Sequence, residues 1–234
     1  MGFYDNYSKR SLSGYREKLQ KQMYERLLHK YVENGFAGKR FLEIGPGTGL
    51  VAEIVTQSGG DYTAVEGNEV LSGNLVEKGF EVVTQTVPPI PFPDNSFDYV
   101  FHSHLIEHMP TFVDAFKLTE ECVRVVKPGG KLVFAAPDYM RLGKYYWDCD
   151  YTHSFVVTER RVGQLLQDSG ATVELILRYT EPFSGRIGRY VGVLMQLFPY
   201  TFLMDISPFR FLKLFFYKVR ATFLQCLFVV AVKE

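Results

Sequence analysis

Three glycines at alternate positions, Gly45, Gly47 and Gly49, are the residues whose type and spacing point most directly to chemistry. They follow residues 40–44, a short apolar run that predicts a buried strand, and they precede a predicted helix. Because glycine has no Cβ, such a turn lets a ligand approach the backbone closely, where the first N–H groups of the helix are unpaired. The pattern predicts a site for a nucleotide-like ligand, although many glycine turns are only tight turns.

Two acidic residues narrow the choice of ligand. Glu43 precedes the glycine turn, where a carboxylate repels a pyrophosphate but attracts an ammonium group. Glu66 closes the next predicted strand, where an acid can accept hydrogen bonds from both ribose hydroxyls; the alternative is a solvated acid at a strand end. The third glycine of a dinucleotide fingerprint would fall at Leu50. S-adenosylmethionine, with its amine, sulfonium and adenosine, therefore fits better than NAD.

Histidines are concentrated after the fourth predicted strand. His102, His104 and His108 lie there with Glu107, at the edge of the sheet where ligands of α/β folds bind. A histidine at that edge, with a pKa near neutrality, can take a proton from an oxygen or nitrogen acceptor. The alternative is that this segment packs the following helix. His104 and His108 are four residues apart, but no nearby residue completes a ligand set, so the sequence predicts no metal site.

A second polar cluster follows the fifth predicted strand. It contains Asp150 and His153, with Phe155 just after them. His153 is a candidate base or substrate contact because this segment also starts at the carboxyl edge of the sheet. The alternative, with equal weight, is that His153 caps the helix predicted over 158–169 or binds the backbone. His104, His108 and His153 are therefore the three candidates for acid–base catalysis.

The elements that must position these residues alternate along the chain. Apolar periodicity predicts helices over 15–34, 50–58, 111–125 and 158–169. It predicts strands over 40–44, 61–65, 80–84, 97–101, 131–135, 172–177 and 224–232. Strands that alternate with helices indicate a mostly parallel sheet with helices on both faces.

The chain divides into a helical N-terminal arm over 1–35 and one catalytic domain over 36–234. Residues 183–220 interrupt that domain just before the last strand, and we interpret them as a helical insertion. Residues 183–234 include seven basic residues and only two acidic ones, and they are rich in Phe and Leu. Such a segment suits a lid over an amphipathic acceptor or an interfacial helix; the alternative is a helical cap or a dimer interface.

Composition limits the classes of function. The 234 residues suit one domain, and the formal net charge of zero gives no reason to expect nucleic acid as a partner. The three cysteines are scattered, so no disulfide framework is expected. The first residues lack an apolar leader, and no stretch is apolar enough to span a bilayer. We expect a cytoplasmic protein, with peripheral contact to a membrane left open by the insertion.

Taken together, the motifs resemble those of the class I S-adenosylmethionine-dependent methyltransferases. The resemblance covers residues 36–180 and depends on four features in order: residues 43–49, Glu66, residues 90–98 and residues 126–132. It implies a Rossmann-like sheet of seven strands, mostly parallel, whose last strand is antiparallel and inserted between the fifth and the sixth.

The resemblance also implies contacts with S-adenosylmethionine. Glu43 and the glycine turn would hold the methionine portion, and Glu66 would hold the ribose. Similar enzymes often carry Asp where this chain has Thr86, so adenine recognition would pass to the Thr86 hydroxyl or to the backbone around Thr86 and Val87. The segment after the fourth strand would line the cofactor near its methyl group, through His102, Ser103 and Leu105. The N-terminal aromatics Tyr4, Tyr7 and Tyr15 would close over the cofactor or form a surface arm.

These observations favour a methyltransferase. We expect transfer of a methyl group to an oxygen or nitrogen of a small-molecule, saccharide or lipid-linked acceptor. One alternative is a catalytically silent scaffold that binds the cofactor or a membrane. A second, less favoured because of the glycine spacing and Glu43, is an NAD-dependent oxidoreductase.

Overall fold

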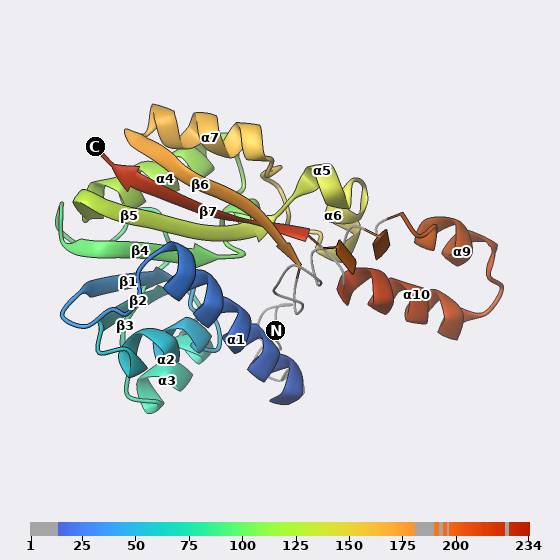
Figure 1. Cartoon of the computed structure of the whole chain (residues 1–234), viewed down its shortest axis with the longest axis horizontal. Helices are drawn as coiled ribbons and strands as arrows, with labels where there is room; N and C mark the ends of the chain where they lie inside the picture. Colours follow the sequence, from blue (N-terminus) through green and yellow to red (C-terminus); the bar gives the residue numbers. More distant parts are fainter. Residues whose placement is uncertain (1–13, 181–189, 192–193, 196, 223–224) are drawn as a thin grey trace.

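A seven-stranded sheet forms the centre of the computed structural model, which describes residues 14–180, 190–191, 194–195, 197–222 and 225–234 (Figure 1). The order of the strands is β3-β2-β1-β4-β5-β7-β6. Their bounds are β1 Arg40–Ile44, β2 Asp61–Glu66, β3 Glu81–Thr84, β4 Phe97–Ser103, β5 Val126–Pro137, β6 Ala171–Thr180 and β7 Gln225–Lys233. Strands β1 to β5 pair in parallel, whereas β7 is antiparallel to β5 and β6. The predicted Rossmann-like α/β fold is confirmed.

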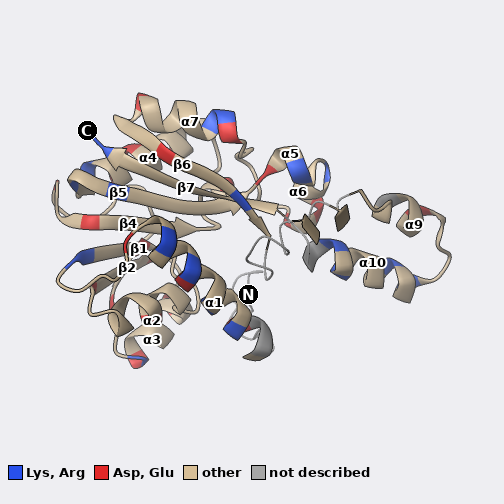
Figure 2. Ribbon diagram, viewed as in Figure 1, with Lys and Arg blue, Asp and Glu red and all other residues tan. Residues whose placement is uncertain are grey.

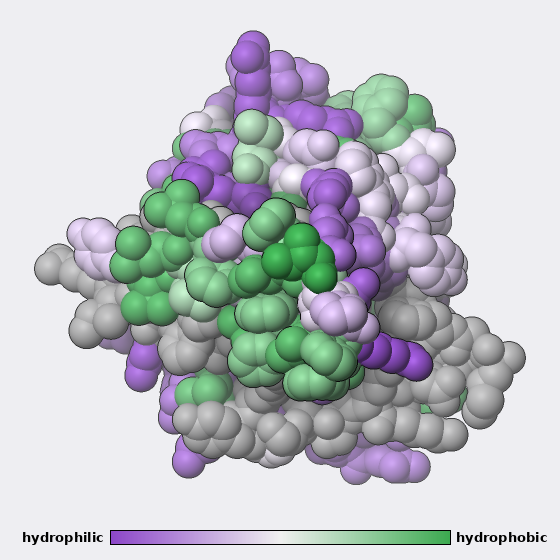
Figure 3. Space-filling model, turned by 90° about the vertical axis from the view of Figure 1, so that its right-hand side faces the viewer, coloured by the Kyte–Doolittle hydropathy of each residue, from purple (hydrophilic) through white to green (hydrophobic). Residues whose placement is uncertain are grey.

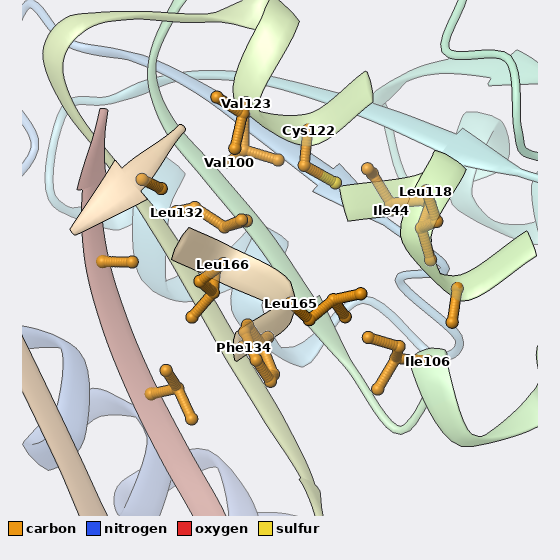
Figure 4. Packing of buried hydrophobic residues seen from close by; sticks show 14 of the residues in the cluster. Ile44, Val100, Ile106, Leu118, Cys122, Val123, Leu132, Phe134, Leu165 and Leu166 are labelled. Atoms are coloured by element: carbon orange, nitrogen blue, oxygen red, sulfur yellow. The ribbon is translucent and has the colours of Figure 1, made fainter. Parts of the chain in front are cut away.

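Helices cover both faces of the sheet (Figure 1). The bounds of the helices are α1 Gly14–Tyr31, α2 Leu50–Gln57, α3 Glu69–Glu77, α4 Phe112–Val125, α5 Tyr139–Leu142, α6 Tyr145–Cys149, α7 Glu159–Asp168, α9 Tyr200–Ile206 and α10 Arg210–Thr222, with a 3-10 turn η2 at Ile106–His108. Helices α1 and α2 share one hydrophobic cluster with the sheet, and α4 and α7 share the other. Figure 4 shows this second cluster, in which Cys122 and Leu118 of α4 and Leu165 of α7 meet sheet residues.

The first strand explains why both faces must be covered. Its residues from Phe41 to Ile44 are all buried, so their side chains alternate between two apolar layers. Phe41 packs with α1 and α2, whereas Leu42 and Ile44 pack on the side of α4 and α7. A parallel strand that is apolar on both faces is stable only with helices on each side.

Helix α3, which connects β2 to β3, is not predicted by apolar periodicity. The segment is short and has Ser72, Gly73 and Asn74 in its middle, which are poor helix formers, so its helical signal is weak. Its start depends on a local polar contact, because the Asn68 side chain accepts hydrogen bonds from the N–H groups of Val70 and Leu71 at 3.0 and 3.1 Å. Leu71 and Leu75 then bury the inner side of the helix.

Strand β5 is longer than predicted at both ends. Helix α4 ends at Val125, as predicted, but the strand begins at the next residue and includes Pro128, Gly129 and Gly130. The pairing with β4 changes register between Phe97 and Tyr99, which accommodates the glycines in the ladder.

The insertion before β7 lies at the carboxyl edge of the parallel strands. There β7 begins, with Cys226 paired to Pro137 and Gln225 paired to Thr180. Helices α9 and α10 pack on each other and project outward from this edge (Figure 1). The last turns of α10 are attached to α5 and α6: the Arg220 guanidinium lies 4.4 Å from the Tyr145 ring centroid and donates a hydrogen bond to the Leu142 carbonyl.

Parts of the chain on which two predictions depend lie outside the described residues. These parts are 1–13, which hold Tyr4 and Tyr7, and 181–189 at the start of the insertion. No helix among the described residues is both long and apolar enough to cross a membrane.

Candidate functional site

The glycine turn has the backbone that its residue types predict. Gly45, Gly47 and Gly49 have φ values of 67°, 57° and 85°, in the left-handed region that glycine adopts without strain. A Cβ on Gly49 would lie 2.7 Å from Leu75 Cδ2, whereas a Cβ on Gly47 would meet no atom within 4 Å. Gly49 is therefore needed for packing, and the open space at Gly47 is available to a ligand. Helix α2 starts directly after the turn, without a side-chain cap.

Glu43 is buried beneath this turn. The Tyr62 hydroxyl donates a hydrogen bond to Glu43 Oε2 at 2.6 Å. Burial raises the pKa of Glu43 to about 8, because removing a carboxylate from water costs more than the bond from Tyr62 recovers. Without a cation beside it, the carboxyl group is thus mostly neutral at pH 7. A cationic group bound beside it would restore the charged form.

Glu66 connects the end of β2 to the glycine turn. Its Oε1 accepts a hydrogen bond from the Asn68 N–H at 2.9 Å. Burial raises the pKa of Glu66, while the backbone N–H groups of Asn68, Gly47 and Gly67 act in the opposite direction. The structure therefore brings Glu66 and Gly47 together, as a shared ribose and methionine site requires.

The end of β3 lies beside the end of β2. Thr86 is exposed, and a Cβ on Gly67 would lie 3.2 Å from Thr86 Cγ2. The Gln85 N–H donates a hydrogen bond to the Glu66 carbonyl, which holds the two segments in register. Val87 is partly buried against the core. Thr86 is thus next to the predicted ribose site, and its contact with adenine stays a prediction.

The residues at the end of β4 differ in exposure. His102 is only 2% exposed, stacks on Phe134 with ring centroids 4.9 Å apart, and has no hydrogen-bond partner for Nδ1 among the described residues. Burial lowers its pKa to about 4, so the ring is neutral. Ser103 Oγ lies 2.5 Å from the Tyr24 hydroxyl of α1, and Leu105 lies against Gly45. His102 is therefore a core residue, while Leu105 borders the turn.

His104 is the exposed member of a histidine–glutamate pair. Its φ of 51° is unusual for a side chain other than glycine, and its N–H donates to the Ala135 carbonyl. Its Nδ1 lies 3.1 Å from Glu107 Oε1, and 37% of its side chain is exposed. Although burial alone raises the pKa of Glu107, the hydrogen bond and charge of His104 hold that pKa below its usual value.

His108 and His153 come together although 45 residues separate them. Their ring centroids are 4.9 Å apart, and both rings lie beside Glu107. The predicted cap role for His153 does not appear, since Thr158 caps α7 by accepting from the Arg161 N–H. The neighbour of His108 comes from beyond β5, so no residue close in sequence to His104 and His108 completes the cluster. No sequence signal linked these two segments.

Comparison with known proteins agrees with this geometry. Residues 42–134 match the family model described as a methyltransferase domain. An uncharacterized methyltransferase of Mycobacterium sp. is 33% identical over 100 residues, which are 42% of this chain and 38% of that protein. The ubiquinone biosynthesis O-methyltransferase of Idiomarina loihiensis is 30% identical over 115 residues, which are 45% of this chain and 46% of that protein. The matches thus span less than half of these relatives.

Solved structures resemble the whole chain. A SAM-dependent methyltransferase from Aquifex aeolicus has a TM-score of 0.63 at 17% identity and covers 100% of both chains. Phosphoethanolamine N-methyltransferase 2 from Haemonchus contortus, in complex with S-adenosyl-L-methionine, has a TM-score of 0.65 at 18% identity and covers 100% of this chain and 60% of that one. These likenesses concern the fold. Residues 42–134, which carry the motifs around Gly47 and Glu66, therefore match the methyltransferase domain family, and the fold of the chain is that of S-adenosylmethionine-dependent methyltransferases of known structure.

Proposed function

We propose that this protein transfers a methyl group from S-adenosylmethionine to an oxygen atom of an amphipathic, lipid-linked acceptor. The observation that carries the proposal is the meeting of Glu43, Gly47 and Glu66 at the carboxyl edge of the sheet. Ligands of open α/β sheets bind at this edge.

Each part of the cofactor has a matching group. The ammonium of the methionine portion would lie near Glu43, whose carboxyl group becomes charged beside a cation. The ribose hydroxyls would donate hydrogen bonds to Glu66. The open backbone at Gly47 leaves room for the chain between them. This arrangement gives both Glu43 and Glu66 a role in binding and explains why the turn needs glycine.

Methyl transfer is an in-line displacement. The acceptor oxygen forms a bond to the methyl carbon while the carbon–sulfur bond breaks, and the bonding pair stays on sulfur. Holding both partners in line supplies much of the rate. The proton of the acceptor hydroxyl would pass to His104 Nε2. Glu107 suits this role for His104, because an ionised carboxylate accepts the Nδ1–H and leaves the lone pair on Nε2.

The relatives favour oxygen over nitrogen as the acceptor atom. Ubiquinone biosynthesis O-methyltransferases from several bacteria are 30–31% identical over 42–45% of this chain. The cofactor motifs and the segment with His104 lie within residues 42–134, which match the methyltransferase domain model. A saccharide acceptor is less favoured, since no further observation supports it.

The acceptor class is inferred from the α9–α10 hairpin, residues 200–222. Six large apolar side chains on it are each more than half exposed: Phe202, Ile206, Phe209, Phe211, Leu214 and Phe215. Helix α10 also carries four basic residues and no acidic residue (Figure 2). Figure 3, which views the molecule from this end, displays hydrophobic residues gathered over it. An apolar and basic surface suits an anionic lipid layer that presents the acceptor.

Two assays test the proposal. Calorimetry with S-adenosylmethionine and with NAD should give binding of the first alone. Radiolabelled methyl transfer should then be measured on hydroxylated aromatic acceptors with and without a polyprenyl chain. We expect transfer to the chain-bearing acceptors and little to the short ones. Binding of NAD alone would overturn the cofactor assignment, and equal use of short water-soluble acceptors would overturn the acceptor class.

A further inference from the structure

A second set of groups lies next to the proposed base and has no part in cofactor binding. Glu107 and His108 belong to the turn η2, and His153 follows helix α6. One potential ligand atom from each residue lies within 4.8 Å of the other two. Among the described residues, this is the one group of three or more such side chains that converges in this way.

Hydrogen bonding determines which nitrogen of His153 carries the proton. Its Nδ1 lies 2.6 Å from the Tyr146 carbonyl oxygen, which can only accept a hydrogen bond. Nδ1 therefore carries the hydrogen, and in the neutral ring the lone pair is on Nε2. The contact also holds the ring in one orientation, since His153 is 7% exposed and Tyr146 is buried.

His108 has the same tautomer for a related reason. Its Nδ1 lies 2.7 Å from Thr152 Oγ1, and the same hydroxyl lies 2.7 Å from Asp150 Oδ1. Because the ionised carboxylate only accepts, the single hydroxyl hydrogen goes to Asp150, and the hydroxyl accepts from His108. The neutral His108 ring therefore also has its lone pair on Nε2.

Glu107 supplies the acidic group. The side chain is fully buried, Oε1 contacts His104, and Oε2 has no hydrogen-bond partner among the described residues. A buried polar atom without a partner is costly, about 1–3 kcal/mol or more for a charged group. Such an atom marks a place where a cation or a water belongs.

We propose that Glu107, His108 and His153 bind a divalent transition-metal ion through one carboxylate oxygen and two imidazole nitrogens. Imidazole with carboxylate suits Zn²⁺, Co²⁺ and related ions, whereas Mg²⁺ prefers oxygen ligands alone. Three protein ligands leave a coordination position for water or another oxygen ligand. The proposal depends on this cluster alone and holds whether or not the chain transfers methyl groups.

The surroundings match those of known metal sites. Histidine ligands usually donate their second ring N–H to a carbonyl oxygen or, directly or through a relay, to a carboxylate. His153 donates to the Tyr146 carbonyl, and His108 donates to Thr152, which is itself bonded to Asp150. Ligand atoms at about 2.1 Å from a tetrahedral ion are about 3.4 Å from one another, so a pair of these atoms that is 4.8 Å apart must approach by about 1.4 Å on loading.

Metal binding should be measured on the full chain after treatment with a chelator. Equilibrium dialysis against Zn²⁺, followed by elemental analysis, should give about one tightly held ion per chain, and Mg²⁺ at the same concentration should give none. Co²⁺ should produce visible absorption bands typical of nitrogen and oxygen ligands. Glu107→Gln and His153→Gln should each weaken Zn²⁺ binding more than about 100-fold. His29 lies on α1, away from the cluster, so the control variant His29→Gln should bind Zn²⁺ as the parent does.

A conservative variant protects the test against misfolding. Thr152→Val keeps the shape of the side chain but removes the acceptor of the His108 N–H, and it should weaken Zn²⁺ binding by about 10–100-fold and shift the Co²⁺ spectrum. The proposal is wrong if the parent protein retains no Zn²⁺. It is equally wrong if Zn²⁺ binds unchanged in folded Glu107→Gln and His153→Gln. A buried water at Glu107 Oε2 would then be the better account.

Discussion

The Tyr62 hydroxyl donates a 2.6 Å hydrogen bond to the Glu43 carboxyl group, and both side chains are buried. The residues lie on the neighbouring strands β2 and β1, on the face of the sheet covered by α1 and α2. Burial raises the pKa of both groups, that of Glu43 to about 8. At pH 7, without a cation nearby, the two side chains therefore form a neutral pair beneath the glycine turn.

Binding of the cofactor should release a proton through Glu43. An ammonium group beside the carboxyl lowers its pKa, so between about pH 6 and pH 8 the affinity for S-adenosylhomocysteine should rise with pH. Calorimetry at pH 7 in two buffers of different ionisation enthalpy measures the released proton directly. The same titration on Glu43→Gln should show weaker binding and less proton release. Binding of the parent protein without proton release would remove Glu43 from the ammonium site.

Glu43 should also make stability depend on pH. Its pKa is raised by folding, so the folded state holds a proton that the unfolded chain loses above about pH 4.5. The carboxyl group therefore costs stability progressively from about pH 4.5 to pH 8, at about 1.4 kcal/mol per pH unit, up to about 5 kcal/mol. Glu43→Gln keeps an acceptor for Tyr62 and has no such titration. Urea unfolding at pH 5.5 and 8 should show the variant gaining stability relative to the parent at the higher pH; a constant difference would contradict the assignment.

Glu66 should contribute directly to cofactor affinity. Glu66→Ala removes the acceptor for the ribose hydroxyls, and S-adenosylmethionine should bind about 1–3 kcal/mol more weakly. Glu69→Ala is the matched control, because Glu69 is an exposed acid in the first turn of the next helix. Equal affinities for the two variants, measured by calorimetry, would place the ribose elsewhere.

His104 should act in the transfer step. Replacing it by Gln removes the lone pair that takes the acceptor proton, and kcat should fall about 100-fold or more while the affinity for S-adenosylmethionine changes little. Steady-state kinetics with the polyprenylated acceptor supplies both values. If kcat stays at the level of the parent protein, proton removal by His104 is not part of the reaction.

The α9–α10 hairpin should attach the protein to anionic lipid. Phe211 and Phe215 are exposed, so the double change to Ser should alter folding stability little but reduce binding to vesicles that contain phosphatidylglycerol. Co-sedimentation measures this, with phosphatidylcholine vesicles as the neutral comparison. Phe112→Ser, at an equally exposed site on α4, should bind as the parent does. If the double change instead converts a dimer of the parent protein into a monomer, as measured by light scattering, the hairpin is an interface between copies of the chain.

Much of the fold could be predicted from local sequence. A few residues are enough to predict the apolar strands β1, β2 and β4 and the glycine turn at 45, 47 and 49. The reason is that backbone sterics and burial on both faces act over short distances. Helix α3 escaped prediction because its start depends on the Asn68 cap and not on apolar periodicity.

The sequence by itself determined the order of the functional motifs along the chain. A glycine turn lies between two acidic residues, and a histidine cluster follows. Only the tertiary structure decided how deeply those side chains are buried and which partners they contact. It buries His102 against Phe134, and it places His153 beside His108 across 45 residues. The reason is physical, since the pKa of a side chain and its partners depend on which segments the sheet brings together at one edge. No local pattern carries that information, whereas the turn at Gly47 needs nothing beyond its own backbone.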